Sequence, residues 1–220
     1  SIKNKIEIKN TLKAHKEDGV ALTKFLYWFK NNKNKISEKK VEAQLQKFRE
    51  KSKNYLYPSF DTIAGSGPNG AIIHYKSSNL TNRVIKKNDI LLIDSGGQYK
   101  WGTTDITRTI SLGKVSNAIK NNFTRVLKGH ISVITCDLNK NFNGHLIDKL
   151  ARKPLKNAGL NYSHGTGHGV GFFLNVHEGP QGITKFNGIK LEEGMILSNE
   201  PGYYKEGKFG IRIENLLYIK

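Results

Sequence analysis

Four acidic residues and one histidine, each in or beside an apolar, strand-like stretch, constrain this sequence more than any other feature. Asp94 and Asp105 lie eleven positions apart in LLIDSGGQYKWGTTDITRT, His168 lies in SHGTGHGVG, and Glu200 and Glu214 lie in SNEPGYY and IRIEN. Carboxylates gathered in one pocket repel one another unless a cation or a metal ion compensates them. The sequence therefore predicts a fold that brings these five side chains together around divalent metal ions.

Composition limits the class of protein. The 220 residues are 37% hydrophobic, which suffices for a substantial core, and no linker or low-complexity stretch divides residues 1–220, so we expect one domain. The lone cysteine, Cys136, excludes an internal disulfide and fits a reducing, cytoplasmic location. No apolar run reaches the ~18 residues of a membrane span, and the basic N-terminus lacks the apolar centre of a secretory signal.

The net charge of +18 has two interpretations. A compact basic patch would indicate a nucleic-acid or anionic-membrane partner. Lysines scattered over the surface would reflect only a lysine-rich composition. Lysine far outnumbers arginine and no run forms an arginine-rich patch. We therefore predict no specific nucleic-acid partner and no membrane partner.

Helical spacing of apolar residues predicts four helices. The first lies within residues 19–32, and the second starts after Ser37, a good N-cap. The third starts after Ser116, and the fourth surrounds Leu146–Leu155 and ends by Gly159.

Strand-like segments follow each pair of helices. In the first half they are residues 71–75, 90–94 and 105–113, and in the second half residues 164–173, 194–204 and 209–219. Two helices followed by a set of strands, repeated once, predicts an α+β fold with two pseudo-equivalent halves.

His164 and His168 are four residues apart, as in a helical HExxH zinc site, but alternating glycines around them argue against a helix. In a strand, both imidazoles lie on one face and point into the same pocket. His177 follows nine residues after His168. Three histidines in this stretch favour a functional site over a structural role.

The acids also have structural explanations. Two turn-capping aspartates in a hairpin would account for Asp94 and poorly for Asp105, and Glu200 precedes a proline, as a surface turn residue would. Arg212 and Glu214, however, are two positions apart in an apolar strand and face the same way. A buried charged site explains that pair better than an isolated ion pair does.

The ligand chemistry limits which metal ions are suitable as the cofactor. Four carboxylates and one imidazole form a hard, oxygen-rich set that suits two manganese ions, with cobalt, iron or zinc as substitutes. Two ions sharing carboxylates would lower the pKa of a water held between them. The reaction that follows is hydrolysis of an amide or an ester.

Seven stretches, taken together, resemble the pita-bread metallopeptidases, and within them the aminopeptidase P (Xaa-Pro aminopeptidase) branch. They are GPNGAIIHY, LLIDSGGQY, GTTDITRT, HGTGHGVG, LNVHEGPQ, NEPGYY and GIRIEN, and the resemblance runs from about Ile6 to the last residue. It implies the pita-bread fold, with helices packed on a curved, mostly antiparallel sheet.

The resemblance also implies roles. The metal ligands would be Asp94, Asp105, His168, Glu200 and Glu214, with Asp105 and Glu214 bridging two ions, Asp94 on one ion, and His168 and Glu200 on the other. Glu200 would also act as the general base. The histidines that position substrate and stabilise the tetrahedral intermediate would be His74, His164 and His177, and Arg212 with Tyr204 would support Asp94.

The implied reaction releases the N-terminal residue of a peptide whose second residue is proline. Proline has no N–H and a fixed φ, so a pocket shaped for its ring can select it. Full-length members of this branch carry an upstream domain and a C-terminal extension linked to dimer contacts. We therefore expect residues 1–220 to be a catalytic domain, and the full-length protein to be able to form a homodimer.

Four alternatives compete with this assignment. Prolidase differs only in accepting dipeptides alone, whereas HGTGHGVG with LNVHEGPQ argues against methionine aminopeptidase. Non-catalytic pita-bread proteins that bind nucleic acid or ribosomes fit the positive charge, but not the complete ligand set. A phosphate-binding loop at AGSGPNG lacks the Gly-Lys-Ser/Thr ending of a P-loop.

Overall fold

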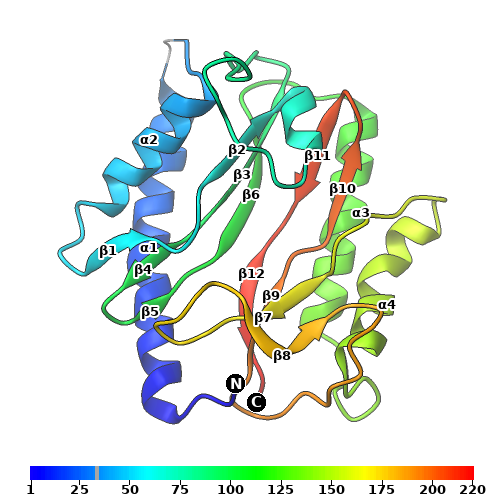
Figure 1. Cartoon of the computed structure of the whole chain (residues 1–220). Coiled ribbons are helices and arrows are strands. Elements are labelled where there is room, and N and C mark those ends of the chain that lie inside the picture. Colours follow the sequence, from blue (N-terminus) through cyan, green and yellow to red (C-terminus); the bar gives the residue numbers. More distant parts are fainter. Residues whose placement is uncertain (33–34) are drawn as a thin grey trace.

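The chain forms two successive sets of helices and strands (Figure 1). The computed structural model describes residues 1–32 and 35–220. The helices are α1 (Lys5–Asn31), α2 (Glu38–Arg49), the short 3₁₀ helix η1 (Gly67–Ala71), α3 (Asn117–Ile134) and α4 (Gly144–Lys156). The first-half strands are β1 (Tyr55–Pro58), β2 (Ile63–Ser66), β3 (Ile90–Ser95), β4 (Gly97–Tyr99), β5 (Gly102–Thr103) and β6 (Ile106–Ser111). The second-half strands are β7 (Gly167–Gly169), β8 (Glu178–Ile183), β9 (Ile196–Asn199), β10 (Gly202–Lys205), β11 (Phe209–Arg212) and β12 (Asn215–Tyr218).

Helix α1 begins earlier than the predicted range 19–32. Asn4 accepts hydrogen bonds from two backbone N–H groups of the first turn, and the side chain of Glu7 bonds back to the Asn4 backbone. This capping box starts the helix well before the apolar stripe becomes regular. The helix continues through Gly19, although glycine has a low helix propensity, so the sequence pattern suggested a start at that residue.

The caps predicted for the other helices are confirmed. Ser37 accepts from the backbone N–H of Lys40 at the start of α2, and Ser116 accepts from that of Ile119 at the start of α3. The fourth helix extends one residue beyond Leu155, and Gly159 follows with a positive φ of 71°.

The apolar faces of the helices pack on the strands of their own half. Phe25 and Phe29 of α1 and Leu45 of α2 are fully buried against β2 and β3. In the second half, Val126 of α3 and Leu155 of α4 are fully buried in a cluster that includes β11. Each such side chain contributes roughly 1.5–3 kcal/mol by leaving water.

Antiparallel pairing places the acidic strands in register. Strand β3 lies between β2 and β6, and Asp94 pairs with Thr107. In the second half the order is β12-β9-β7-β8, while β10 and β11 form a separate hairpin. This arrangement puts the ends of β3, β7, β9 and β11 close together.

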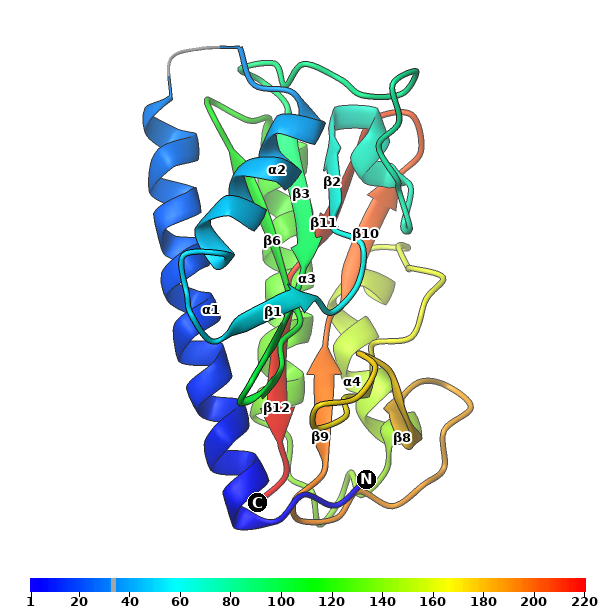
Figure 2. The same cartoon turned by 60° about the vertical axis from the view of Figure 1, so that its left-hand side comes forward.

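The two halves meet where β11 and β12 run beside β6 (Figures 1 and 2). Thr109 Oγ1 donates to the carbonyl of Arg212 at 2.9 Å and accepts from its N–H at 3.1 Å. The backbone N–H of Glu214 donates to the carbonyl of Thr107 at 3.3 Å. Arg108 Nη1 donates to the carbonyl of Glu214 at 2.7 Å. These bonds fix the second-half glutamate against the first-half sheet.

Residues 71–75 do not form a strand, so that prediction was wrong. Pro68, near the start of η1, favours a helical turn because its φ is fixed and it lacks an N–H. The chain continues in a turn, in which the N–H of Tyr75 bonds to the carbonyl of Ile72 at 3.1 Å. The strand of this region is instead β2, which precedes η1.

Three further predicted strands are interrupted. Residues 194–204 contain β9 and most of β10, with Glu200 and Pro201 between the two strands. Of residues 164–173, only the middle forms β7. Within residues 209–219 the chain changes partners between β11 and β12, because Ile213 N–H bonds to the carbonyl of Pro201 while Glu214 N–H bonds to Thr107. These breaks place ligand-type side chains at strand ends rather than within continuous strands.

Two backbones touch where η1 packs on β11. A Cβ built on Gly210 would lie 1.7 Å from the carbonyl oxygen of Gly70. Glycine therefore serves close packing here and not phosphate binding.

This contact yields a stability prediction. We expect Gly210→Ala to lower the free energy of unfolding by about 1–3 kcal/mol, measured by urea denaturation. The matched control is Gly19→Ala within α1, where a Cβ meets nothing within 4 Å and alanine is the better helix former. Equal stability of the two variants would contradict the prediction.

Candidate metal centre

Residues from both halves line a cavity of about 330 Å³. Its polar lining comprises Asp94, Asp105, His168, Glu200 and Glu214 together with His74, His164, His177 and Arg212. Its apolar walls include Phe60, Ile63, Ile73 and Val176. The structure thus gathers in one cavity the five residue positions that the sequence singles out as metal ligands.

Four of the five side chains come from the end of an element or from a break between elements, and the fifth comes from a strand of only three residues. Asp94 is near the end of β3, and Asp105 immediately precedes β6. His168 is the middle residue of β7, Glu200 directly follows β9, and Glu214 lies between β11 and β12. Strand ends can bring side chains from distant segments close without breaking the ladder of backbone hydrogen bonds.

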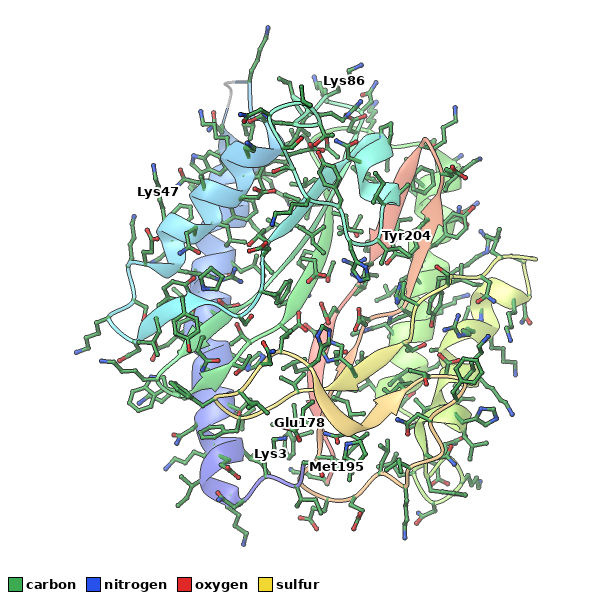
Figure 3. The ribbon with its side chains drawn as sticks, in the orientation of Figure 1. Lys3, Lys47, Lys86, Glu178, Met195 and Tyr204 are labelled. Carbon is green, nitrogen blue, oxygen red and sulfur yellow. The ribbon has the colours of Figure 1, made fainter. Side chains whose placement is uncertain are left out.

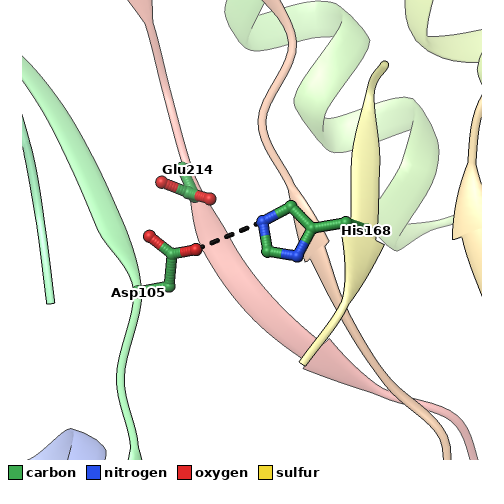
Figure 4. Close-up of side chains that lie close together, drawn as sticks. All are labelled: Asp105, His168 and Glu214. Carbon is green, nitrogen blue, oxygen red and sulfur yellow. Dashed lines mark ion pairs between the residues drawn. The ribbon is translucent and has the colours of Figure 1, made fainter. Parts of the chain in front are cut away.

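The imidazole of His168 lies close to two of the acids. His168 Nε2 lies 3.3 Å from Asp105 Oδ2 and 3.4 Å from Glu200 Oε1. Ligand atoms of Asp105, His168 and Glu214 all lie within 4.8 Å of one another (Figure 4). Such spacing allows the three groups to coordinate a common ion.

The hydrogen bonding of His168 sets its tautomer for coordination. Its Nδ1 lies 2.9 Å from the carbonyl oxygen of Gly169, which can only accept. Nδ1 therefore carries a proton, and Nε2 is the ring nitrogen that faces Asp105 and Glu200. Nε2 is thus the nitrogen of this ring that is placed to bind a metal ion.

Asp94 carries a further mark of a metal ligand. Its Oδ2 accepts a hydrogen bond from Arg212 Nη2 at 2.7 Å. Its Oδ1 is buried and has no hydrogen-bond partner in the described part of the chain. A buried carboxylate oxygen without a donor is costly unless a cation occupies its free side.

The acids of the site destabilise one another when no cation is bound. Burial raises the pKa of Asp105, and the nearby charges of Asp94 and Glu200 raise it further. Burial also raises the pKa of Glu214, with Asp105 as the next contributor. The pKa of Glu200 is raised by burial, although His168 opposes the shift. A divalent cation would reverse this balance by favouring every ionised form.

The described residues therefore fit a metal site. The donor set is rich in oxygen with one imidazole, one carboxylate oxygen lacks a partner, and the Nδ1 hydrogen bond of His168 leaves its Nε2 facing the acids. This chemistry favours hard divalent ions over copper.

An ordered chain of hydrogen bonds connects Arg212 to His164 through Tyr204, which projects from β10 (Figure 3). Arg212 Nη1 donates to Tyr204 Oη at 2.6 Å, and Tyr204 Oη donates to His164 Nε2 at 2.8 Å. His164 Nδ1 bonds to the carbonyl of Gly165 at 2.7 Å. Both ring nitrogens of His164 are thus engaged inside the protein.

Electrostatics supports the same protonation pattern. Burial raises the pKa of Tyr204 to about 12, so its hydroxyl keeps its proton. Burial, followed by the Arg212 charge, lowers the pKa of His164 to about 4. His164 is therefore neutral near pH 7, and its Nε2 accepts the hydrogen bond from the Tyr204 hydroxyl.

His177 contacts the site differently. Its ring centroid lies 4.3 Å from that of His168, and burial, then the His168 charge, lowers its pKa. The following residue, Glu178, is held at the start of β8 by Lys3, whose Nζ lies 2.8 and 2.7 Å from the two carboxylate oxygens (Figure 3). The N-terminal segment thereby anchors the chain beside His177.

Two hydroxyl residues of the site were missed by the sequence analysis. Thr107 Oγ1 donates to Glu214 Oε2 at 2.7 Å. Ser198 Oγ donates to Glu200 Oε1 at 2.9 Å and accepts from the backbone N–H of His168 at 3.0 Å. Ser198 lies two positions before Glu200, so strand alternation could have identified it.

A buried histidine of α3 was missed as well. His130 Nδ1 lies 3.0 Å from the carbonyl of Asn199, and Asn215 Nδ2 lies 3.3 Å from His130 Nε2. These asparagines directly precede Glu200 and follow Glu214. Only the folded structure shows this link, because His130 lies on the ordinary buried stripe of a helix.

The chain belongs to metallopeptidase family M24, whose sequence profile matches residues 9–220. A probable Xaa-Pro aminopeptidase P of Laccaria bicolor is 47% identical over 226 residues, covering 100% of this chain and 35% of that protein. An uncharacterized peptidase of Schizosaccharomyces pombe is 46% identical, covering 99% of this chain and 38% of that protein. The chain thus spans just over a third of the length of these curated relatives. The family predicted from the sequence motifs is confirmed.

Solved structures confirm the predicted pita-bread α+β fold. An X-prolyl aminopeptidase of Caenorhabditis elegans, described as a cytosolic enzyme with a di-nuclear active site, superposes with a TM-score of 0.92 at 37% identity. It covers 99% of this chain, which covers 36% of it. A prolidase of Pyrococcus furiosus gives a TM-score of 0.88 at 29% identity, covering 100% of this chain and 62% of that one.

No helix within residues 1–32 and 35–220 combines the length and the apolar character needed to cross a bilayer.

Proposed function

We propose that this chain is the catalytic domain of a dinuclear metal-dependent Xaa-Pro aminopeptidase. The observation that carries the proposal is the approach of His168 Nε2 to Asp105 and Glu200 at 3.3 and 3.4 Å, inside a cavity that Asp94 and Glu214 also line. The relatives named Xaa-Pro aminopeptidase P and the C. elegans enzyme with its di-nuclear site support the same assignment.

The five ligand positions divide between two ions in this proposal. Asp105 and Glu214 would serve both ions, Asp94 would hold one ion, and His168 with Glu200 would hold the other. Manganese suits this donor set, and cobalt, iron or zinc could replace it. When bound, such ions lower the pKa of a coordinated water and polarise the peptide carbonyl.

The protein groups move and hold protons around that centre. Glu200 takes the proton of the attacking water, since burial raises the pKa of its carboxyl and Ser198 holds one of its oxygens in a fixed direction. His74 and His177 face the cavity and bind the substrate and the oxyanion of the tetrahedral intermediate. His164 positions the substrate through its ring edge, because Gly165 and Tyr204 occupy its nitrogens. Arg212 supports Asp94.

The substrate class is a peptide with proline in second position. Apolar side chains such as Phe60, Ile73 and Val176 line the cavity beside the polar centre and suit a proline ring. The site needs no acceptor for an N–H that proline lacks. We further propose a cytoplasmic location and a homodimeric full-length enzyme, with no specific nucleic-acid partner.

The test is a matched pair of short peptides that differ only by proline or alanine in second position. With added manganese, mass spectrometry should show loss of one N-terminal residue from the proline peptide alone. Cleavage of both peptides would refute the specificity. No cleavage, together with no bound metal and tight RNA binding at physiological salt, would favour a non-catalytic role.

A prolidase-like activity is the second candidate, because the P. furiosus prolidase shares the fold over the whole chain. The same assay separates the two functions when an Xaa-Pro dipeptide is added. Turnover of the dipeptide with none of the longer peptide would identify a prolidase.

Tyr204→Phe tests the chain of hydrogen bonds between Arg212 and His164. We expect kcat/KM for the proline peptide to fall about 10-fold, because His164 loses the donor that orients its ring. Tyr203→Phe is the matched control, since its ring packs against Phe209 instead. Equal rates for the two variants would rule out this role for Tyr204.

A further inference from the structure

His74 reaches the cavity on a segment with little regular structure. The segment runs from Ser66 to Arg83 and contains only η1. Within residues 1–32 and 35–220, the side chain of His74 makes no hydrogen bond, and it is exposed. Its position over the metal centre therefore depends on how the backbone of this segment is held.

One carboxylate holds the segment at both ends and in the middle. Glu38 Oε1 accepts from the backbone N–H of Ser66 at 2.7 Å, and Oε2 accepts from that of Arg83 at 2.9 Å. Tyr75, the neighbour of His74, donates its hydroxyl to Oε2 at 2.8 Å. Asn69 Nδ2 lies 3.1 and 3.0 Å from the two oxygens.

The carboxylate that holds the segment is buried inside the protein. Glu38 is 0% exposed and Tyr75 is 4% exposed. None of the ion pairs among the described residues includes Glu38, because Arg83 pairs with Asp89 instead. The buried charge of Glu38 is therefore compensated by its hydrogen-bond donors. The N-terminus of α2 also contributes, because Glu38 is the first residue of that helix. An arrangement this demanding fixes one conformation of the segment.

We propose that Glu38 is a positioning residue for His74, acting through the hydroxyl of Tyr75. The carboxylate determines where the His74 ring meets the substrate and touches neither substrate nor metal itself. The inference rests on the proposed peptidase function, since it assigns a part in that reaction.

The test uses two variants and a matched control. Tyr75→Phe removes only the hydroxyl, and Glu38→Gln keeps the shape but presents an amide group to donors. Glu42→Gln is the control, because Glu42 lies one turn further along α2 and accepts from Ser77 of the same segment at 2.8 Å, whereas it makes no hydrogen bond to Tyr75.

We expect both test variants to lower kcat/KM for the proline peptide by about 10- to 100-fold, with unchanged bound metal. Hydrogen–deuterium exchange of residues 66–83 should become faster. The control should change neither quantity. Unchanged exchange in both test variants would overturn the proposal.

A second arm separates positioning from general stability. In a His74→Ala background, Tyr75→Phe should cause no further loss of kcat/KM, because the histidine through which it acts is gone. An equal loss in that background would overturn the proposal. If the unmodified protein cleaved no Xaa-Pro peptide, the proposed function would fail, and the exchange data alone would decide whether Glu38 holds the segment.

Discussion

Glu200→Gln is expected to lower kcat for a proline peptide by about 10²–10⁴-fold while leaving the fold intact. The amide keeps the shape of the side chain and can still accept the hydrogen bond from Ser198. It cannot take a proton from water at neutral pH. The measurement is steady-state kinetics, with thermal unfolding and bound metal determined on the same samples.

The matched control for this substitution is Glu193→Gln, because Glu193 is exposed. It should leave kcat unchanged. A near-normal rate for Glu200→Gln with normal metal content would remove Glu200 as the base. A lost rate with lost metal would instead show that Glu200 acts mainly as a ligand, so the metal determination decides between the two roles.

The second large expected effect is a change in the stability of the protein on replacing Glu214. The direction of this change depends on whether metal is bound. In the presence of a chelator, Glu214→Gln is expected to be more stable than the unmodified protein by about 1–3 kcal/mol near pH 8. Glu214 is 1% exposed, and burial followed by the charge of Asp105 raises its pKa well above the ordinary value. Glutamine removes that buried charge and retains the size.

The pH dependence follows from the direction of the shift. A carboxyl whose pKa is raised by folding binds its proton more tightly in the folded state, so the penalty is absent below the unfolded pKa. It grows as the pH rises through the folded pKa. The advantage of Glu214→Gln in chelator should therefore shrink as the pH falls from about 8 toward about 5.

Saturating manganese should invert the order. The unmodified protein gains stability from the bound ions, whereas the variant lacks one of the proposed bridging ligands. Thermal unfolding with chelator and with manganese gives both comparisons, and a difference of this size shifts Tm by several degrees. A variant that was less stable than the unmodified protein in chelator near pH 8 would contradict the account.

Much of the candidate site could be predicted from sequence because buried charge is rare in apolar strands. Asp94 follows four apolar residues, and Glu214 follows Ile213. Such acids need partners, so their convergence was foreseeable. The interruptions at the strand ends were not, because each depends on a partner far along the chain, as Ile213 depends on Pro201.

Other features could not be predicted for a different reason. The branched and aromatic residues of AIIHY are typical of a strand, yet Tyr75 is buried because its hydroxyl bonds to Glu38. Glu38 itself is indistinguishable in sequence from a solvent-exposed first-turn glutamate. Local periodicity reports which side chains are apolar, whereas these two depend on a hydrogen bond between residues 37 positions apart.

The division of the cavity between the two halves has a consequence for the chain as a whole. The first half provides Asp94 and Asp105, and the second provides His168, Glu200 and Glu214. A chain cleaved between β6 and α3 would yield two fragments, each with an incomplete set. The cut leaves intact the groups that form the hydrogen bonds between β6 and the β11–β12 segment, so mixing the fragments should rebuild the cavity. Neither fragment should be active alone.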